Sequence, residues 1–224
     1  MIHVIRRYER VSSELIGRFE GIAAATVHEA YGRQGAMAAR IKPIYSGMRL
    51  CGTALTVKAH PGDNLMLHKA IDICQPGEVI VVDHDGYEGG AWGENMTMSA
   101  MAKGCAGLVT NGCVRDTLNI KALGFSVFSI GVSMKGTSKE TLGLINHPIS
   151  CGGVVVYPGD LVVGDDDGVC VVKREKAVEV LELAQAREAM EAERQKAYQK
   201  GKSAWNSNKL NLIAASKGLV EEEV

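Results

Sequence analysis

The sequence has few aromatic residues, almost no excess charge and no long hydrophobic run. Aromatic residues make up 5% of its 224 residues, and 25 Lys and Arg against 26 Asp and Glu leave a formal net charge of -1. Nucleic acids and acidic membranes bind basic faces, so this balance gives no reason to expect either partner. No apolar run reaches the roughly 18 residues of a membrane span, and the first ten residues are too charged for a signal peptide. We therefore expect a cytoplasmic protein that binds neither nucleic acid nor membrane.

Several binding and catalytic motifs are also absent. The six cysteines form no C-x-x-C pair, which argues against a zinc knuckle and favours small core side chains. Neither a G-x-x-x-x-G-K-[ST] loop nor a strand followed by G-x-G-x-x-G occurs, and there is no G-x-S-x-G elbow. Nucleotide binding and serine hydrolase chemistry therefore have little support.

The first 130 residues do contain an alternation of strand and helix patterns. Helical spacing occurs over about 12–31, 65–74, 94–103 and 117–123, and strand patterns occur over 50–59, 78–83 and 125–130. This βαβ repetition favours a largely parallel central sheet. The turn Pro61-Gly-Asp-Asn64 before the second helical stretch gives Asp63 and Asn64 a structural role as turn and helix-cap residues.

After residue 150 the pattern changes to short strands over 152–157, 160–163 and 169–172, joined by glycine-containing turns. These strands are typical of antiparallel hairpins, so the sequence predicts an α/β protein with mixed sheets. The run Asp165-Asp-Asp167 lacks the spaced acidic pattern and terminal glutamate of a calcium loop, and we interpret it as a hairpin turn.

The last fifty residues begin with a long, charged helix over about 175–200. Its second half, 187–196, is too polar to pack far into its own domain. Two interpretations remain open, a helix that lies across another subunit and a solvated, partly frayed helix. The sequence thus predicts a single domain over 1–174, followed by a helix and tail over 175–224.

The pattern richest in chemistry is Gly104-Cys-Ala-Gly-Leu-Val-Thr-Asn-Gly-Cys-Val-Arg115-Asp116, in which a short apolar run, expected to be a strand, ends in a glycine-bearing turn and two opposite charges. In open α/β folds ligands gather at such strand ends. One segment earlier, Gly93-Glu94-Asn95-Met96 begins a helix whose free amides favour a carboxylate, and Arg115 could bind the same anion. Asp116 supplies the hard oxygen that Mg²⁺ or Mn²⁺ prefers, and Glu94 could hold a coordinated water.

Each of these residues also has a simpler explanation. Arg115 and Asp116 could form an ordinary surface ion pair, and Cys113 is more typical of a buried structural thiol than of a nucleophile. Lys139, in Gly136-Thr-Ser-Lys-Glu-Thr141, is the best candidate for a Schiff-base lysine and is otherwise a surface charge.

Seven segments in order resemble one family, which joins class II 4-hydroxy-4-methyl-2-oxoglutarate/4-carboxy-4-hydroxy-2-oxoadipate aldolases with RraA regulators of ribonuclease activity. The resemblance extends from about Ile22 to Arg174. Its segments are Thr26-Val-His-Glu-Ala30, Gly52-Thr-Ala-Leu-Thr-Val57, Pro61-Gly-Asp-Asn64, the Gly93 turn, Gly112-Cys-Val-Arg-Asp116, Gly136-Thr-Ser-Lys-Glu-Thr141 and Pro158-Gly-Asp-Leu-Val-Val-Gly-Asp-Asp-Asp-Gly168.

The resemblance implies an αββα sandwich with a swivelling β/β/α-type core, assembled as homotrimers or homohexamers with sites between subunits. It implies a lyase that releases pyruvate from a 4-hydroxy-2-oxo di- or tricarboxylic acid in aromatic compound degradation, and that also decarboxylates oxaloacetate. The implied cofactor is Mg²⁺ or Mn²⁺.

The resemblance also implies roles for individual residues. Asp116 matches the direct metal ligand, and Glu94 matches an acid that contacts the metal through water. Arg115 matches the group that stabilises the enolate. The substrate's carboxylates would be bound by the Gly93 turn with the amides of Asn95 and Met96, and by Lys139. Possible outer-shell residues are Glu29, Glu191 and Glu193, the last two from a neighbouring subunit.

Two positions depart from the aldolase pattern. Asn119 stands three residues after Asp116, where aldolase members often carry an acid, and the tail Gly201-Lys-Ser-Ala-Trp-Asn206 is atypical. RraA regulators share the fold and bind ribonuclease machinery without catalysis. A regulator is therefore the alternative function.

Overall fold

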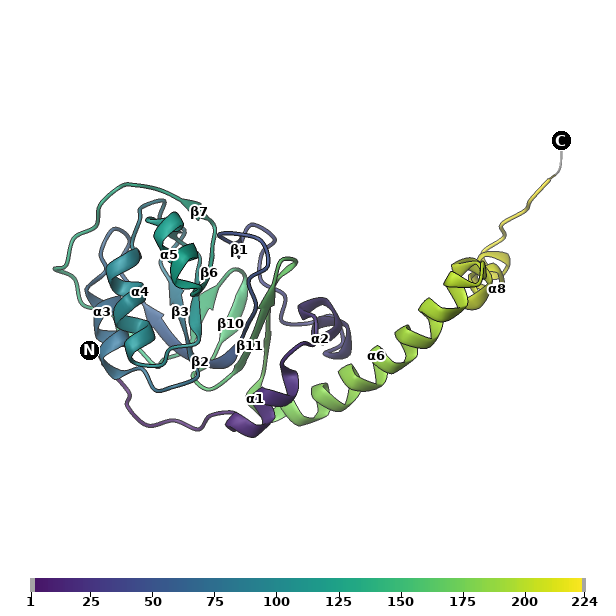
Figure 1. Ribbon diagram of the computed structural model, residues 1–224, viewed down its shortest axis with the longest axis horizontal. Helices are drawn as coiled ribbons and strands as arrows, with labels where there is room; N and C mark the ends of the chain where they lie inside the picture. Colours follow the sequence, from purple (N-terminus) through teal and green to yellow (C-terminus); the bar gives the residue numbers. More distant parts are fainter. Residues whose placement is uncertain (1–2, 223–224) are drawn as a thin grey trace. The chain divides into compact units, whose positions relative to one another are not determined.

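A mixed eight-stranded sheet forms the centre of the structure, a computed structural model that describes residues 3–222. The strand order is β1-β6-β4-β3-β2-β11-β12, with β8 paired to β2 (Figure 1). The parallel strands are β2 (Leu50–Lys58), β3 (Glu78–Asp83), β4 (Gly107–Thr110) and β6 (Ser126–Ser129). The antiparallel strands are β1 (Lys42–Pro43), β8 (Leu144–Ile145), β11 (Leu161–Asp165) and β12 (Gly168–Val172). The predicted mixed α/β architecture is confirmed.

The sheet curls until its two edges are nearly joined. Residues just before β1 run along β12, where the Met37 amide donates to the Val169 carbonyl at 2.9 Å and the Val171 amide donates to the Gly35 carbonyl at 2.8 Å. The same segment then pairs through β1 with β6, at the other edge. It therefore connects the two edges, and the sheet is almost a closed barrel.

Two further pairs of short strands lie outside this sheet, β5 (Cys113–Val114) with β7 (Gly131–Val132) and β9 (Ile149–Cys151) with β10 (Val154–Val156). The strand predicted over 152–157 begins two residues too early, because β10 starts at Val154. Gly152 and Gly153 have φ angles of 58° and 80°, a left-handed conformation suited to the turn between β9 and β10. The hairpin turn expected at Asp165-Asp-Asp167 is confirmed between β11 and β12.

Helices pack on both sides of the sheet. The connecting helices of the parallel part are α3 (Leu65–Ile73), α4 (Glu94–Ala102) and α5 (Thr117–Leu123), which lie together away from α1 and α2 (Figure 1). The helical spacing predicted over 12–31 corresponds to two helices, α1 (Ser13–Phe19) and α2 (Ala24–Ala30), beside β2, β11 and β12. The chain ends with a 3-10 turn (Arg174–Lys176), α6 (Ala177–Gln199), α7 (Ala204–Ser207) and α8 (Leu210–Ser216). No helix among residues 3–222 combines the length and apolar character needed to cross a membrane.

The chain forms two compact units, one that extends to Ala184 and one that starts at Gln185. The first unit therefore continues ten residues past the boundary expected at Arg174. The reason lies in the first two turns of α6, where Val180, Leu181 and Ala184 are buried with the side chains of α1, α2, β11 and β12.

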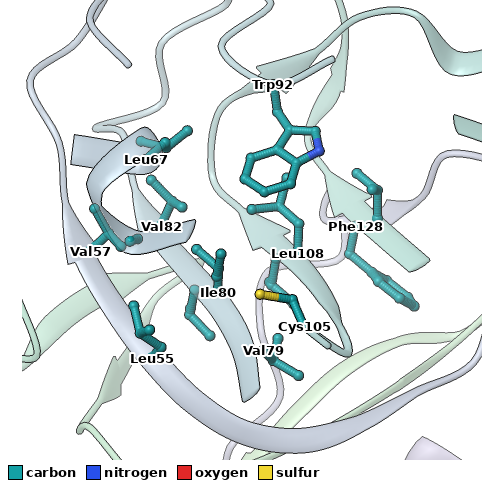
Figure 2. Packing of buried hydrophobic residues seen from close by; sticks show 14 of the residues in the cluster. Leu55, Val57, Leu67, Val79, Ile80, Val82, Trp92, Cys105, Leu108 and Phe128 are labelled. Atoms are coloured by element: carbon teal, nitrogen blue, oxygen red, sulfur yellow. The ribbon is translucent and has the colours of Figure 1, made fainter. Parts of the chain in front are cut away.

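The larger core cluster fills the space between the parallel strands and their helices. Leu67 of α3 faces Val57 and Val82, and the Trp92 ring stands over Leu108 (Figure 2). Trp92 is 1% exposed and stacks on Phe125 with ring centroids 6.2 Å apart. Because Trp92 lies two residues before α4, this packing fixes the point at which α4 starts.

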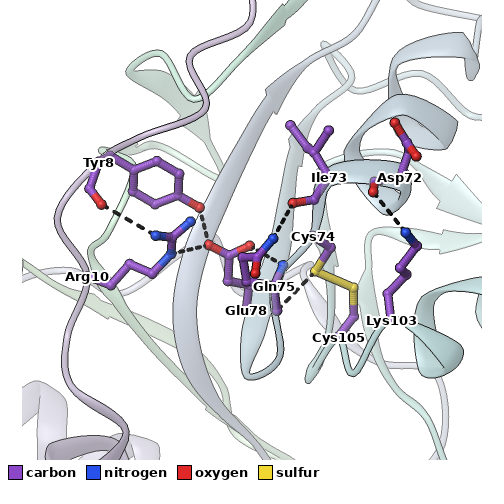
Figure 3. The surroundings of a disulfide bond; sticks show 9 residues. All are labelled: Tyr8, Arg10, Asp72, Ile73, Cys74, Gln75, Glu78, Lys103 and Cys105. Atoms are coloured by element: carbon purple, nitrogen blue, oxygen red, sulfur yellow. Dashed lines mark hydrogen bonds and ion pairs between the residues drawn. A yellow bond between two sulfur atoms is a disulfide. The ribbon is translucent and has the colours of Figure 1, made fainter.

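The cysteines occupy two kinds of position. Cys51, Cys113, Cys151 and Cys170 are free and wholly or partly buried, as expected for small core residues. The prediction missed a disulfide between Cys74, which ends α3, and Cys105, which precedes β4 (Figure 3). The two cysteines are 31 residues apart in the sequence, and only the packing of α3 beside α4 brings them together.

Candidate functional site

Gly93, the residue before α4, forms one side of the candidate site, where the start of α4 lies close to the start of α5. Its φ of -153° is open to any residue, but a Cβ atom there would lie 2.3 Å from Asp116 Oδ2. Without a Cβ atom at Gly93, the Asp116 carboxylate fits in its observed position, where it accepts a hydrogen bond from the Glu94 amide at 3.1 Å. The amides of Asn95 and Met96 have no acceptor among residues 3–222. These two amides, called the amide pair below, provide the donors and the positive dipole end that bind an anion.

Arg115 and Asp116 lie directly beside this helix start. The Arg115 amide donates to the Trp92 carbonyl at 2.8 Å, which connects the end of β5 to the segment before α4. Asp116 caps α5 with a φ of 58°, a left-handed conformation that is uncommon outside glycine and often found at functional sites. The Arg115 Nε atom is 3.7 Å from Asp116 Oδ2, and both side chains are more than 40% exposed. The expected grouping of Gly93, Glu94, Arg115 and Asp116 is thus present.

Asn119 contacts the site directly. Its Nδ2 atom donates to Glu94 Oε2 at 2.7 Å, one turn after Asp116 on α5. This bond fixes the Glu94 carboxylate between the starts of α4 and α5. At position 119, where the aldolase pattern often has an acidic residue, this chain therefore has a neutral hydrogen-bond donor that orients the carboxylate of Glu94.

The donors present fit a divalent ion that keeps most of its water. Among residues 3–222 no three His, Cys, Asp or Glu side chains gather into a ready-made metal site. Asp116 Oδ1 and Glu94 Oε1, however, accept no hydrogen bond from the described part of the chain. Two carboxylate oxygens, hard and open to solvent, are the partial ligand set that Mg²⁺ commonly uses.

Lys139 lies on a separate loop, residues 136–143, called the Lys139 loop below. Its ammonium group is exposed and has no ion-pair partner in the described part of the chain. Ser138, the residue before Lys139, forms a parallel bridge with Asp63, which places this loop beside the start of α3. Partial desolvation and then the charge of Lys139 lower the pKa of His68 on that helix. This loop follows the strand β7 that pairs with β5, so it extends from Arg115 toward the start of α3.

Two residues predicted only as turn and cap, Asp63 and Asn64, also contact the segments that carry the candidate site residues. Asp63 does cap α3, since its Oδ1 atom accepts from the Leu65 amide at 2.8 Å, but its Oδ2 atom accepts three hydrogen bonds from the Lys139 loop. The Asn64 side chain makes no cap bond and instead donates to the Ala91 carbonyl at 3.0 Å, next to the start of α4. An acidic residue in a Pro-Gly turn gives no sign of such distant partners.

Of the possible outer-shell glutamates, Glu29 lies apart from this group within one chain. Glu29 is bonded to Arg33 Nε at 3.2 Å on α2, which packs on β11 and β12, whereas β3 and β2 separate those strands from β4. Figure 1 shows α2 far from α5. Glu191 and Glu193, in the unit that starts at Gln185, pair with Arg187 and Lys196 on their own helix.

The electrostatics of Cys113 support its structural interpretation. Burial raises the pKa of the Cys113 thiol, which disfavours the reactive thiolate. The nearby charge of Glu88 acts in the same direction. Cys113 thus supports the chain before Arg115 as a core side chain.

Comparisons with known proteins identify the family to which the chain belongs. Residues 24–171 match the family model described as RraA-like, Aldolase/RraA. A protein of Halalkalibacterium halodurans named "Putative 4-hydroxy-4-methyl-2-oxoglutarate aldolase" is 36% identical over 185 residues, which cover 82% of this chain and 88% of the relative.

Solved structures show the same fold. An uncharacterized protein from Pseudomonas syringae superposes with a TM-score of 0.78 and 28% identity, over 88% of this chain and 97% of that one. Streptomyces coelicolor RraAS2, described as an unusual member of the RNase ES inhibitor RraA protein family, superposes with a TM-score of 0.74 and 28% identity, over 84% of this chain and all of that one.

Proposed function

Because the chain belongs to the RraA-like (Aldolase/RraA) family, we propose that it is a lyase of the aldolase type within that family. Its substrate would be a 4-hydroxy-2-oxo di- or tricarboxylic acid, such as 4-hydroxy-4-methyl-2-oxoglutarate or 4-carboxy-4-hydroxy-2-oxoadipate, cleaved to pyruvate and a 2-oxo acid. Oxaloacetate decarboxylation would occur at the same site. The observation that carries the proposal is the meeting of Arg115, Asp116 and the amide pair at one helix start.

The geometry suits a 2-oxo acid because that group carries a carboxylate next to a carbonyl. The amide pair of Asn95 and Met96, at the Gly93 turn, would bind the carboxylate, and the exposed Arg115 guanidinium would reach the neighbouring oxo oxygen. Cleavage of the adjacent carbon-carbon bond places negative charge on that oxygen. Arg115 would stabilise this charge, and Lys139 would bind the distal carboxylate.

Asp116 and Glu94 would hold Mg²⁺ or Mn²⁺, Asp116 directly and Glu94 through water. When bound, such an ion would supply Lewis-acid stabilisation of the developing enolate charge. Asn119 would keep the Glu94 carboxylate oriented toward the same point, where it could accept and return the proton of the 4-hydroxyl group.

We also propose that a second copy of the chain covers this site, in a homotrimer or homohexamer. Large apolar side chains that follow Arg115 on α5, or lie on or just after the β7 strand paired with β5, are open to solvent, with Leu118, Val132 and Met134 at 81%, 61% and 94% exposure. Exposed apolar side chains that gather into one patch are typical of subunit interfaces. The neighbour's α6 would then place Glu191 or Glu193 near the site, with Glu29 as a further outer-shell residue.

A coupled assay that measures pyruvate release tests the proposed function. The purified protein is given oxaloacetate and several 4-hydroxy-2-oxo acids, with Mg²⁺, with Mn²⁺ and with a chelator. Pyruvate should form with either metal and stop with the chelator. Arg115→Ala should abolish it and Asp116→Asn should raise the metal concentration required, whereas Arg174→Ala, which removes a surface pair with Glu9, should leave the rate unchanged.

The alternative, a regulator that binds ribonuclease machinery without catalysis, is favoured by the likeness to RraAS2. Absence of pyruvate from every 2-oxo acid tested would remove the main support for the lyase. Recovery of a ribonuclease with the tagged protein, lost in Leu118→Glu, would then favour the regulator.

A further inference from the structure

A buried carboxylate fixes the Lys139 loop on both sides of Lys139. Asp63 is 1% exposed, and its Oδ2 atom accepts hydrogen bonds from Ser138 Oγ at 2.8 Å, the Glu140 amide at 2.6 Å and the Thr141 amide at 2.9 Å. All three donors lie within two residues of Lys139. A buried carboxylate with this many donors is a strong and geometrically specific anchor.

The backbone around Asp63 reinforces the anchor. The Ser138 amide donates to the Gly62 carbonyl at 2.8 Å, and the Asn64 amide donates to the Ser138 carbonyl at 3.0 Å, so the two segments form a short parallel bridge. The fully buried His84 ring lies 2.9 Å from the Asp63 carbonyl through Nε2. The Lys139 loop is therefore attached to the core rather than to the surface.

The next residue connects this anchor to the amide pair. Asn64 is 6% exposed, and its Nδ2 atom donates to the Ala91 carbonyl at 3.0 Å and lies 3.6 Å from Met96 Sδ. Met96 contributes one of the two free amides. Adjacent residues of one rigid turn thus contact both the loop that carries Lys139 and the helix start that carries the amide pair.

We propose that Asp63 and Asn64 fix the separation between Lys139 and the amide pair, and thereby select 2-oxo acids that carry a second carboxylate. This inference rests on the proposed function. Two carboxylates on one short substrate require two binding points at a set distance, and a misplacement of about 1 Å is enough to lose much of the benefit. Without the hydrogen bonds from Asp63, the Lys139 loop would become ordered only when the substrate binds. The entropy lost in ordering the loop would then weaken substrate binding.

The side chain of Asp63 suits this role better than its amide isostere would. Burial by itself would raise the pKa of Asp63, but the hydrogen bonds from Glu140, Leu65, Ser138 and Thr141 lower it to about 2. The group therefore stays ionised and accepts from every donor. An asparagine would turn an NH₂ group toward either the Lys139 loop or the Leu65 amide, and those donors would lose their acceptor.

The test is a double-mutant cycle on the active enzyme, with two substrates. For a 4-hydroxy-2-oxo dicarboxylate, Asp63→Asn and Lys139→Ala should each raise KM by about tenfold, a loss of about 1.4 kcal/mol, with kcat little changed. For a 4-hydroxy-2-oxo acid without the distal carboxylate, neither change should alter KM. The double variant should be no worse than Lys139→Ala alone, because Asp63 acts through Lys139.

Two further variants complete the experiment. Asp72→Asn is the matched control, because Asp72 is an exposed residue of α3 that pairs with Lys69. This variant should leave KM unchanged for both substrates. If Asp63→Asn does not fold, Ser138→Ala removes one of the three loop bonds and should raise KM for the dicarboxylate alone by a smaller factor.

The outcomes separate the inference from the proposed function. Wild-type protein that releases no pyruvate from either substrate overturns both. Two results with an active wild type overturn only the role of Asp63. In the first, the KM increases caused by Asp63→Asn and Lys139→Ala multiply in the double variant. In the second, Asp63→Asn raises KM equally for both substrates. Amide hydrogen exchange at residues 138–141 should be faster in Asp63→Asn than in wild type, and unchanged exchange would also overturn it.

Discussion

At the scale of single residues, the candidate site depends on how closely three backbone segments approach. The segment before α4, the end of β5 and the start of α5 meet where Gly93 lacks a side chain and Asp116 adopts a left-handed conformation. Trp92 holds these segments together through two hydrogen bonds. Its carbonyl accepts from the Arg115 amide, and its Nε1 atom donates to Thr97 Oγ1 at 2.8 Å. A substitution that adds even one atom where these segments meet would therefore move the proposed catalytic groups apart.

Gly93→Ala tests this close approach. The added Cβ would lie 2.3 Å from Asp116 Oδ2, so the Asp116 carboxylate must rotate away from the Glu94 amide or α4 and α5 must move apart. We expect a loss of about 1–3 kcal/mol in the free energy of unfolding and at least a tenfold loss of pyruvate release. Gly17→Ala is the control, because a Cβ at that helical position meets no atom within 4 Å. A fully active Gly93→Ala protein would show that the carboxylate of Asp116 need not lie against α4.

Asp63 should make stability depend on acid pH. Its folded-state pKa, about 2, lies below the ordinary value of 3.8, so the ionised form stabilises the fold at pH values above about 4. The stabilisation disappears as the pH falls from about 4 to 2. Urea unfolding should therefore show a large difference between wild type and Asp63→Asn at pH 7 and a smaller one at pH 3. A difference that does not change with pH would contradict the ionised, hydrogen-bonded state of Asp63.

At the scale of elements, α3, α4 and α5 all begin at the edge of the sheet where the parallel strands end. Parallel strands joined by helices place successive helix starts on one side, and open α/β folds bind ligands at this edge. The turn of Asp63 and Asn64 precedes α3, Gly93 precedes α4, and Asp116 precedes α5. The opposite ends of α3 and α4 are joined by the disulfide between Cys74 and Cys105.

Thiol counting and thermal unfolding test this disulfide. Denatured, unreduced protein should show four reactive thiols, and reduced protein should show six. Closing a loop of 31 residues restricts the unfolded chain, so reduction should lower the free energy of unfolding by about 2–4 kcal/mol. Cys105→Ser should be insensitive to reductant. Six reactive thiols in unreduced protein purified from a reducing cytosol would show that the pair is reduced there.

At the scale of the whole molecule, two hydrophobic clusters share the central sheet. One fills the space under α3 and α4, and the other joins α1, α2 and the first two turns of α6 to β11 and β12. From Gln185 to Glu222 no described residue is buried. The first unit therefore contains all the buried side chains that the structure describes.

Two truncations test this division. A chain that ends at Ala184 should unfold at the same temperature as the full chain, because it keeps Val180 and Leu181 in the core. A chain that ends at Lys176 loses these side chains and should be less stable by more than about 3 kcal/mol. If Glu191 or Glu193 serves a neighbouring site, the first truncation should also lower the rate of pyruvate release. Equal stability of the two truncations would contradict the assignment of α6 to the core.

Local patterns were sufficient to predict most elements of the fold. The apolar run Glu78–Asp83 is a buried strand, and the helical spacing at 94–103 and 117–123 corresponds to α4 and α5. Glycine turns separated these elements correctly because turn and strand preferences act over a few neighbouring residues. The exceptions are local too, such as Gly152 and Gly153, which form a turn where a strand was expected.

Local patterns and motif matches were enough to predict the mixed α/β fold, the family and the residues that we propose to bind a 2-oxo acid and a metal. The tertiary structure established which of these residues meet. It placed Asp116 against the amide of Glu94, paired Asn119 with Glu94, and connected Asp63 to a loop 75 residues later through Ser138. The physical reason is that hydrogen bonds between distant segments depend on the pairing of strands and the packing of helices, whereas spacing along the chain reports only neighbours.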